Sequence, residues 1–576
     1  MRYCIALILF TLNSINCKNF AEKSLKQVLV ENTYQHFIMY GQSLSVGAQS
    51  YPVLSTENID GNYMLGDHIW INFWNNSKSK LNPLIGKLAK QDSSGAADLY
   101  PFTKDGSTTA ECPLYGTVNH LQKKIGGNFI ATSCGTGGRS IEELSKESKI
   151  SGRQHYRAEF VNALTNGAKA TKNAGCDINC PVIFFMQGEN NYGKIGYGLG
   201  SGTTATSDKD EYKQLLVTLK DNMQNDITEA YGQNKKPVFI TYQAGCQYTK
   251  VRELSIGMAQ LEASNEYADI ICAGPVYPMP DRGGHLDPNG YRWFGEMLAK
   301  IYYKTQVLGE EFKPLQPKKI TRTNNPYQIK IQYHVPVLPL VLDPYTSGTK
   351  FKYYGFEVYK NDIKQIIQKV EVVDDDCIMI ACFSDVSSGK IELIYAGIGE
   401  NTSQTRGHGN VRDSDNYQAY FEYVDLDKKE NEDYVYPRDP GSSLRAVNEA
   451  KDSSGQAIYD QTYPLYNWSV AFYYKLEDGQ PDYIVPGFFE TDYSNSHVAA
   501  NNDLEVFVLG KKIFISTKNT CNANIVIDIF DIAGHFLFHS VMSESDKYIS
   551  LDSLNKGIYV AKVYVNGISK QIKILI

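Results

Sequence analysis

The N-terminal half of the chain alternates two patterns of hydrophobic and polar positions. Short apolar runs without polar alternation indicate strands buried on both faces. Between them, apolar residues recur every three or four positions, as on one face of a helix. The predicted strands are 37–40, 128–134, 181–187, 237–243 and 269–277, and the predicted helices are 157–175, 211–232, 251–267 and 287–305.

This alternation predicts an α/β domain over residues 30–310, in which helices cover a buried parallel sheet. Polar sites in such sheets lie beyond the carboxyl ends of the strands. The pattern weakens over residues 52–115, which we interpret as an insertion.

Near residues 315–319 the pattern changes to β-type runs separated by clusters of Gly, Asn, Asp and Ser. Residues 316–500 are predicted to form a β-sandwich of the jelly-roll type. Residues 502–576 contain shorter runs of the same kind and are predicted to form a second, smaller sandwich. The fold class expected for the whole chain is therefore an α/β domain followed by all-β sandwich domains.

The first residues have the pattern of an export signal. Arg2 precedes an apolar run, Cys4–Leu12, that is too short to span a bilayer and is followed by polar residues. We interpret residues 1–19 as a signal peptide. A lipoprotein cleavage site at Cys17 is the alternative, although Asn16 fits it poorly. No later stretch has the length and apolar character of a membrane helix.

Composition narrows the class of partner and cofactor. The net charge is −7 with no basic block, which argues against nucleic acid as a partner. The cysteine spacings do not repeat as metal sites do, so structural thiols or bridges are expected, such as Cys176/Cys180 and the weaker pair Cys377/Cys382. The sequence has no Walker-type loop, HExxH or dinucleotide fingerprint. We therefore expect no metal and no other cofactor.

The candidate chemistry begins where the first predicted strand ends, at a Gly-Gln-Ser motif that closes on Ser43. A serine becomes a nucleophile when a base takes its proton, and the resulting oxyanion needs hydrogen-bond donors. Further segments at predicted strand ends offer such groups: the glycines within 133–144, Gln187-Gly188-Glu189, and Asp281 with His285.

In this order, the four segments resemble the SGNH (GDSL-like) hydrolases, and within them the sialate O-acetylesterase and acetylxylan esterase branch. The resemblance covers residues 33–305 and implies a three-layer, flavodoxin-like domain. It implies Ser43 as the nucleophile and His285 as the general base. It also implies an oxyanion hole formed by the amide of Ser43, an amide of Gly137 or Gly138, and the side chain of Gln187.

The acid that orients the imidazole departs from the family pattern. The usual spacing is Asp-x-x-His, whereas Asp281 lies four residues before His285 and Arg282 stands three before it. An extra loop residue still permits the carboxylate to reach the ring, so Asp281 is the predicted acid. Asp287 and Glu189 are rivals, and a Ser–His dyad is a further alternative.

The C-terminal segment 502–576 resembles the sorting domain of type IX secretion substrates of Bacteroidetes. The shared parts are "DIAG", "LNKGIYVAKV" and the closing "KQIKIL". In that family the domain carries a protein across the outer membrane and is often removed or used for surface attachment. The resemblance implies the secretion machinery as a partner and a secreted or cell-surface location.

Together these features predict a secreted carbohydrate O-acetylesterase that works through an acetyl-enzyme on Ser43. The acetylated glycan stays open between sialate, xylan and others. The alternative is a non-catalytic surface protein that binds glycans on a degenerate hydrolase scaffold, and a lipase or thioesterase is a third hypothesis. Taken singly, each motif also has a structural explanation as a turn, a helix cap or a solvated carboxylate.

Overall fold

The computed structural model divides the chain into two compact units, Met1–Phe489 and Glu490–Ile576. The predicted signal peptide, residues 1–19, lies outside the described residues. In the second unit the strands and residues 551 and 554 are described. In the first unit the description covers residues 33–488 except 49, 51–52, 73–77, 87–109, 149, 151, 193–204, 246–251, 281–284, 347–349, 398–406 and 425–461.

An eight-stranded sheet forms the centre of the α/β domain, in the order β3-β2-β4-β1-β6-β7-β8, with β5 also paired to β1. Its strands are parallel except for β3 at the edge. The order β4-β1-β6-β7-β8 is that of flavodoxin-like sheets, and the predicted insertion adds β2 and β3. The strands are β1 (Thr33–Gly41), β2 (Asn62–Leu65), β3 (Leu81–Pro83), β4 (Phe129–Ser133), β5 (Asp177–Asn179), β6 (Val182–Met186), β7 (Val238–Gln243) and β8 (Ile270–Pro275).

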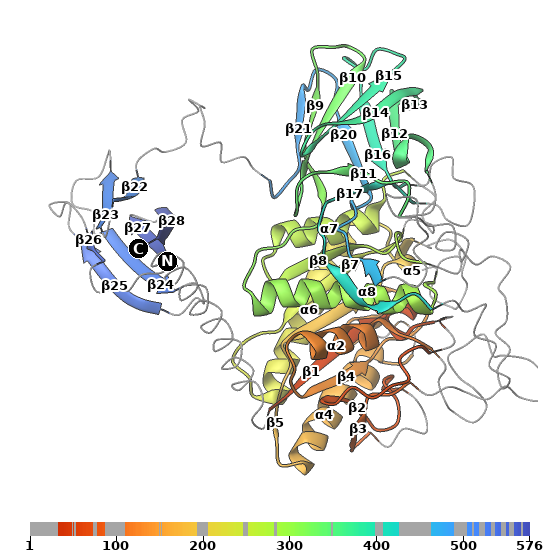
Figure 1. Cartoon of the computed structure of the whole chain (residues 1–576), viewed down its shortest axis with the longest axis vertical. Helices are drawn as coiled ribbons and strands as arrows, with labels where there is room; N and C mark the ends of the chain where they lie inside the picture. Colours follow the sequence, from red (N-terminus) through yellow and green to blue (C-terminus); the bar gives the residue numbers. More distant parts are fainter. Residues whose placement is uncertain are drawn as a thin grey trace, which may run out of the picture. The chain divides into compact units, whose positions relative to one another are not determined.

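Helices flank this sheet (Figure 1), so the predicted α/β architecture is confirmed. Helix α2 packs against α8, while α6 packs against α4 and α7. The helices are α2 (Pro113–Lys124), α3 (Ile141–Leu144), α4 (Asn162–Asn173), α5 (Glu189–Tyr192), α6 (Lys209–Tyr231), α7 (Ser255–Glu266) and α8 (Pro288–Tyr302), with the short turns η1 (Ser43–Val46), η2 (Tyr156–Val161) and η4 (Tyr303–Val307).

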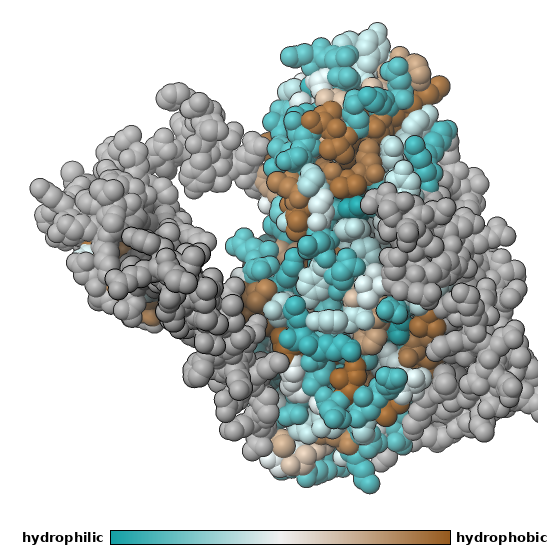
Figure 2. Space-filling view, in the orientation of Figure 1, coloured by the Kyte–Doolittle hydropathy of each residue, from teal (hydrophilic) through white to brown (hydrophobic). Residues whose placement is uncertain are grey.

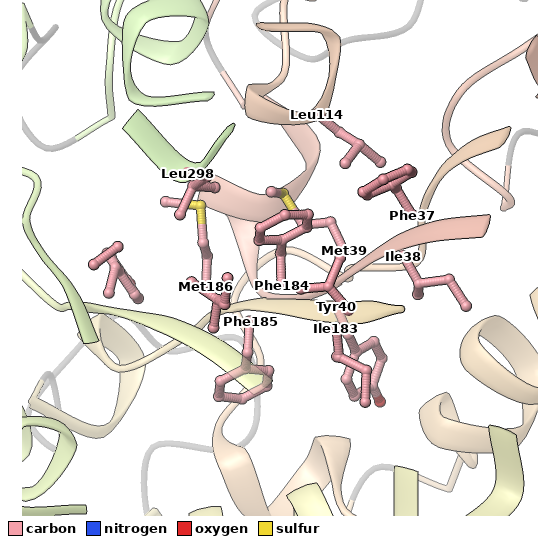
Figure 3. Packing of buried hydrophobic residues seen from close by; sticks show 14 of the residues in the cluster. Phe37, Ile38, Met39, Tyr40, Leu114, Ile183, Phe184, Phe185, Met186 and Leu298 are labelled. Carbon is pink, nitrogen blue, oxygen red and sulfur yellow. The ribbon is translucent and has the colours of Figure 1, made fainter. Parts of the chain in front are cut away.

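Strand β1 lies in the middle of the hydrophobic core, and the side chains of residues 37–40 are fully buried. Because side chains alternate along a strand, Phe37 and Met39 point to one face of the sheet and their neighbours to the other (Figure 3). Leu114 of α2 and Leu298 of α8 lie on the Phe37 side in the same view. The strand at the centre of the sheet therefore packs against the helix pair α2–α8.

Helices α2 and α8 approach each other closely because each carries a glycine at the crossing. A Cβ at Gly116 would lie 2.1 Å from Arg292 O, and one at Gly295 would lie 1.9 Å from Pro113 O. Thr117 Oγ1 donates to Gly295 O at 2.9 Å. The two backbones are thus in direct contact, without side chains between them.

The segment after the α/β domain forms two antiparallel sheets around a second core, as predicted for a sandwich. One sheet has the order β14-β15-β10-β9-β21 and the other β13-β12-β16-β20. Their strands are β9 (Gln316–Arg322), β10 (Gln328–His334), β12 (Phe356–Lys360), β13 (Ile363–Lys364), β14 (Ile367–Asp374), β15 (Cys377–Cys382), β16 (Ile391–Tyr395), β20 (Phe472–Leu476) and β21 (Asp482–Ile484), beside the turn η5 (Lys352–Gly355) and the small pair β11 (Val341–Leu342) with β17 (Val411–Arg412).

A further antiparallel pair, β18 (Gln418–Glu422) with β19 (Thr462–Pro464), leaves the sandwich and packs on α8. Trp293 of α8 donates its indole N–H to Phe421 O at 2.7 Å, and its ring stacks on Tyr463 at 4.5 Å. The core of the α/β domain therefore includes residues that the sequence assigned to the accessory sandwich.

Three charged residues of α8, spaced four apart, are buried against this strand pair. In sequence they resemble a solvent-facing stripe, yet each finds a hydrogen-bond partner on the β-strands or their flanks. Arg292 Nη2 donates to Glu422 O at 2.6 Å, Glu296 Oε2 accepts from Tyr420 N–H at 2.5 Å, and Lys300 Nζ donates to Leu465 O at 2.6 Å.

The second unit consists of two antiparallel sheets, in the orders β22-β23-β26 and β25-β24-β27-β28. This agrees with the predicted all-β segment. The strands are β22 (Leu504–Leu509), β23 (Lys512–Thr517), β24 (Ile525–Asp531), β25 (Phe536–Met542), β26 (Ile549–Ser550), β27 (Ile558–Val565) and β28 (Ile568–Leu575).

The surface of the first unit is mixed in polarity, and Figure 2 shows hydrophobic residues gathered over part of the β-sandwich. The most exposed large apolar side chains of the described residues also belong to the sandwich: Ile363 at 69%, with Ile366 and Phe383 at 63% each. Among the helices that the structure describes, none combines the length and apolar character needed to cross a membrane.

The α2–α8 crossing yields a prediction about stability. Helix propensity alone makes Gly→Ala in a helix stabilising by about 1 kcal/mol. At Gly295 the added methyl group meets the Pro113 carbonyl, so we expect Gly295→Ala to lower the free energy of unfolding by about 1–3 kcal/mol in urea titrations. The exposed α6 variant Glu229→Ala is the control and should stay within about 0.5 kcal/mol of wild type. A more stable Gly295→Ala protein would contradict the packing described.

Candidate active site

The candidate site lies where β1 leaves the sheet. Gly41, its last residue, has a φ of +147°, and a Cβ there would lie 2.0 Å from Met186 O at the end of β6. The next amide, Gln42 N–H, donates to the same carbonyl oxygen at 2.8 Å. Glycine is required because any side chain would separate the two strands. This close approach explains the glycine that precedes Ser43 by two positions.

Ser43 begins the turn η1, which directs the chain away from the sheet edge. Ser43 O accepts from Ala48 N–H at 3.1 Å, and Ser45 Oγ donates to Gln42 O at 2.6 Å. Ser133 Oγ, at the end of β4, donates to Ser45 O at 2.8 Å. These bonds fix the backbone of the turn, while the Ser43 side chain stays partly exposed.

The glycines after β4 bring a second backbone segment beside Ser43. At Gly135 a Cβ would lie 1.8 Å from Ser45 Oγ, so a side chain is excluded. At Gly137 it would lie 3.8 Å from Ser43 Cβ, which is an ordinary contact distance. Gly138 follows with a φ of +69°. The structure therefore places the Gly137 backbone next to the candidate nucleophile.

Gln187, directly after β6, is fully buried, and both ends of its carboxamide are hydrogen-bonded. Nε2 donates to Asn191 Oδ1 at 2.7 Å and to Arg139 O at 3.2 Å, and Oε1 accepts from Tyr212 Oη at 2.8 Å. Asn191 Oδ1 also accepts from Ile141 N–H at 3.0 Å. In this arrangement, Gln187 connects the end of β6 to the glycine segment after β4.

Two further amide side chains hold the site together, and the sequence interpretation gave neither of them a role. Gln42 Oε1 accepts from Gly188 N–H at 3.3 Å and from Asn190 N–H at 3.2 Å, which joins the first motif to the third. Asn191 joins the third motif to the second by accepting from Ile141 N–H. For Gln42 the available signal was an amide residue directly after a strand end, whereas Asn191 lies within α5 and no comparable signal marked it.

Glu111, within the predicted insertion, is a third residue that the sequence interpretation missed. Its buried carboxylate accepts from Leu54 N–H at 2.8 Å and from Ser55 N–H and Oγ at 2.9 and 2.6 Å. A Cβ at Gly47, which ends η1, would lie 2.0 Å from Glu111 O. Glu111 thus packs the insertion against η1, and no local pattern in the sequence marks this role.

His285 lies beside Ser43, with Nε2 at 2.8 Å from the serine Oγ. The histidine stands just before α8, whose first turn is capped by Asp287: Oδ1 accepts from Gly290 N–H at 2.7 Å. The Asp287 N–H donates to Pro280 O at 3.0 Å. The start of α8 is therefore anchored to the segment after β8, and this anchoring holds His285 at the sheet edge.

Burial lowers the pKa of His285 from 6.5 to about 4, because the ring loses the water that stabilises the imidazolium. The ring is therefore neutral at neutral pH. A neutral imidazole with Nε2 at 2.8 Å from a hydroxyl is placed to accept its proton.

The three candidate acids have different positions. Asp281 lies outside the described residues, so its role stays a prediction. Glu189 is buried and accepts from Tyr242 Oη at 2.5 Å and from Gly245 N–H at 3.1 Å. Asp287 caps α8. The hydrogen bonds described for the two rivals thus support the fold around the site.

The cysteines that the structure describes are not paired in disulfides. Cys176 and Cys180, and likewise Cys377 and Cys382, are free thiols, which favours the structural-thiol interpretation. Burial raises the pKa of Cys382 to about 11 and so keeps it protonated. Within the part of the chain that the structure describes, no group of three or more His, Cys, Asp or Glu side chains is placed to hold a metal ion.

Comparison with protein families identifies the C-terminal segment. Residues 510–576 match the model of the secretion system C-terminal sorting domain. This match confirms the predicted sorting tail, and it indicates export to the cell surface or the exterior and an interaction with the secretion machinery. No match to this chain was found among curated protein sequences.

Solved structures with a similar arrangement include esterases and a lipase. A carbohydrate acetylesterase from Xanthomonas citri is 13% identical over 66% of this chain and 77% of that protein, with a TM-score of 0.42. A carbohydrate esterase is 11% identical over 47% and 68%, with a TM-score of 0.25. A lipase from a goat rumen metagenome is 10% identical over 47% and 98%, with a TM-score of 0.24. TM-scores this low carry no argument about the activity of this chain.

The low pKa of His285 predicts an unusual pH dependence. Proton transfer from Ser43 to His285 requires the neutral ring, so any ester hydrolysis at this site should keep a level kcat/KM as the pH falls through 6.5 and decline only near pH 4. The measurement is kcat/KM for p-nitrophenyl acetate against pH, with circular dichroism at each pH as the control for folding. If kcat/KM already declined at or above pH 6.5, this result would contradict the conclusion that burial destabilises the charged form of the His285 ring.

Proposed function

We propose that this chain is an exported serine hydrolase that removes acetyl groups from carbohydrate. The observation that carries the proposal is the 2.8 Å contact between Ser43 Oγ and His285 Nε2. These residues are 242 positions apart in the sequence and meet beyond the carboxyl ends of β1 and β8, where α/β proteins place their sites. A serine, a neutral imidazole and adjacent glycine amides are the groups that acyl transfer requires.

In the first half of the proposed reaction, Ser43 Oγ attacks the carbonyl carbon of an acetyl ester while His285 Nε2 takes the hydroxyl proton. The tetrahedral intermediate collapses when the carbon–oxygen bond to the sugar breaks. The imidazolium then gives its proton to the departing sugar oxygen, and an acetyl group stays on Ser43. In the second half His285 activates a water molecule, which releases acetate and restores the serine.

The proposed oxyanion hole uses the backbone amide of Ser43 and an amide of Gly137 or Gly138. Each such donor typically contributes roughly 2.7–4 kcal/mol to transition-state stabilisation. The position of Gly137 beside Ser43 supports this part of the proposal. For Gln187 to contribute as well, its Nε2 would exchange one of its two hydrogen bonds for the oxyanion, and the longer one, to Arg139 O, is the weaker of the two.

We assign Asp281 as the acid that orients the His285 ring, because it precedes His285 in the fourth motif. Without such an acid, the site would work as a Ser–His dyad. Both carboxylate oxygens of Glu189 have structural partners, which supports the choice of Asp281 over Glu189. Asp287 uses Oδ1 to cap α8 and remains the rival acid.

A carbohydrate substrate follows from the motif resemblance together with the sorting tail. An exported esterase meets acetylated polysaccharides outside the cell, whereas a lipase or thioesterase needs a long apolar groove. The alternative, a scaffold that binds glycans without hydrolysis, does not require an imidazole at hydrogen-bond distance from the serine hydroxyl. The resemblance to the sialate O-acetylesterase branch leaves the sugar itself open.

Replacing the proposed nucleophile tests the mechanism directly. Ser43→Ala should lower kcat for p-nitrophenyl acetate by roughly a thousandfold or more, because no other group can form the acetyl-enzyme. The unfolding midpoint should stay the same, since the Ser43 side chain is partly exposed. Ser145→Ala, which removes a hydroxyl bonded to Ile141 O, is the matched control and should retain activity. Equal hydrolysis by Ser43→Ala and wild type would reject the mechanism.

Removing the sorting tail separates export from catalysis. Deletion of residues 490–576 should leave kcat/KM unchanged, because all four motifs precede residue 290 and the tail is a compact unit of its own. The same deletion should abolish surface delivery in a host with type IX secretion, as measured by cell fractionation. A folded, truncated protein without hydrolysis would make the tail part of the enzyme, and normal display would reject the sorting role.

A further inference from the structure

A cleft of about 480 Å³ lies between the starts of α6 and α7 and strands β20 and β21. Its volume is within the range of small-molecule and saccharide sites. Tyr473, Tyr474 and Tyr483 form its wall on the side of the β-sandwich. The rings of Tyr474 and Tyr483 lie 5.3 Å apart, centre to centre, at an angle of 38°. The cleft therefore has an aromatic wall.

The cleft opens at the same edge of the sheet as Ser43. Helices α6 and α7 follow β6 and β7, so their first turns lie at the carboxyl edge of the parallel sheet. Gln243, the last residue of β7, exchanges two hydrogen bonds of 2.7 Å with the backbone of Ala471, directly before β20. This contact sets β20 beside the edge that carries the candidate site.

Polar groups in the cleft are placed to bind hydroxyls. Glu262 forms ion pairs with Lys209 Nζ at 2.6 Å and with Lys213 Nζ at 3.1 Å, so the charge of its carboxylate is balanced. Tyr474 is 4% exposed, and the described residues offer its hydroxyl no hydrogen-bond partner. Burial raises the pKa of Tyr474 well above 10, so the phenol is neutral and keeps its proton to donate.

The charges around the cleft are nearly balanced. Three carboxylates and two lysines line it, with no cluster of cations that would select phosphate or another polyanion. Aromatic faces bind the apolar face of a sugar ring, while a carboxylate and a phenol bind its hydroxyls. A neutral saccharide satisfies both sets of groups, and a ligand hydroxyl would supply the partner that the buried Tyr474 hydroxyl lacks.

We propose that this cleft binds the neutral polysaccharide chain whose acetylated residue reaches Ser43. The inference rests on the proposed function for the identity of the substrate, but the binding itself requires no catalysis. The cleft contributes affinity for the polymer and none for a small acetyl ester, because a small ester does not extend from Ser43 into it.

Three variants test this inference in the full-length protein. Tyr474→Phe removes the unpaired hydroxyl, Tyr483→Ala removes an aromatic face, and Tyr327→Ala removes a ring that is 47% exposed elsewhere on the sandwich. We expect the first two to raise KM for acetylated xylan by about three- to tenfold. Their kcat on xylan, and their kinetics on p-nitrophenyl acetate, should match those of wild type. Tyr327→Ala should match wild type throughout.

Affinity electrophoresis in gels that contain xylan measures binding without hydrolysis. Wild type and Ser43→Ala should be retarded equally, and Tyr474→Phe and Tyr483→Ala should be retarded clearly less. If both cleft variants retain wild-type KM and retardation, the cleft is only a structural gap between the sheets and the inference is overturned. If wild type hydrolyses no acetyl ester but shows tyrosine-dependent retardation, the cleft assignment stands and the proposed function fails.

Discussion

The approach of β1 to β6 at their carboxyl ends is the constraint on which the candidate site depends. Gly41 makes it possible, because a side chain there would collide with Met186 O. Strand β1 lies between β4 and β6, so the segments that follow these two neighbours flank the serine that follows β1. The glycine segment after β4 and the Gln187 segment after β6 thus reach Ser43 from different directions. Without the close approach, none of these segments would share a site.

The other half of the site depends on α8. Its residues are buried without exception, including the three charged ones, because the sheet, α2 and the pair β18–β19 all pack against it. Buried charges cost free energy unless hydrogen bonds satisfy them, and the β18–β19 pair supplies those bonds. The segment after the α/β domain is therefore part of the support for the helix that carries His285 at its start. The proposed chemistry therefore depends on packing between the α/β domain and the segment that follows it.

Buried amides and carboxylates connect the motifs to one another. Gln42 joins the first motif to the third, Asn191 joins the third to the second, and Glu111 holds the insertion against η1. Each group has hydrogen bonds that a different backbone arrangement would leave unmade, so the network favours one arrangement of the loops. The same reasoning applies to His285, whose ring is kept neutral by its surroundings and so suited to take a proton.

Helix α2 and strands β2, β3 and β5 were not predicted. The sequence by itself determined the alternation of strands β1, β4, β6, β7 and β8 with helices α4, α6, α7 and α8, the sorting tail, and the sheet edge at which the polar motifs gather. These features follow from local periodicity and short motifs, which need no knowledge of distant residues. Only the tertiary structure decided the rest. The spacing of Arg292, Glu296 and Lys300 is that of a solvent-facing stripe, yet strands more than a hundred residues later cover it. Likewise, the sequence offers Gln187 as a free donor, whereas packing engages it with Asn191, Arg139 and Tyr212. A side chain forms hydrogen bonds with the groups that folding brings within about 3 Å of it, and many of these groups are distant in the sequence. The local pattern of residues does not show which groups these are.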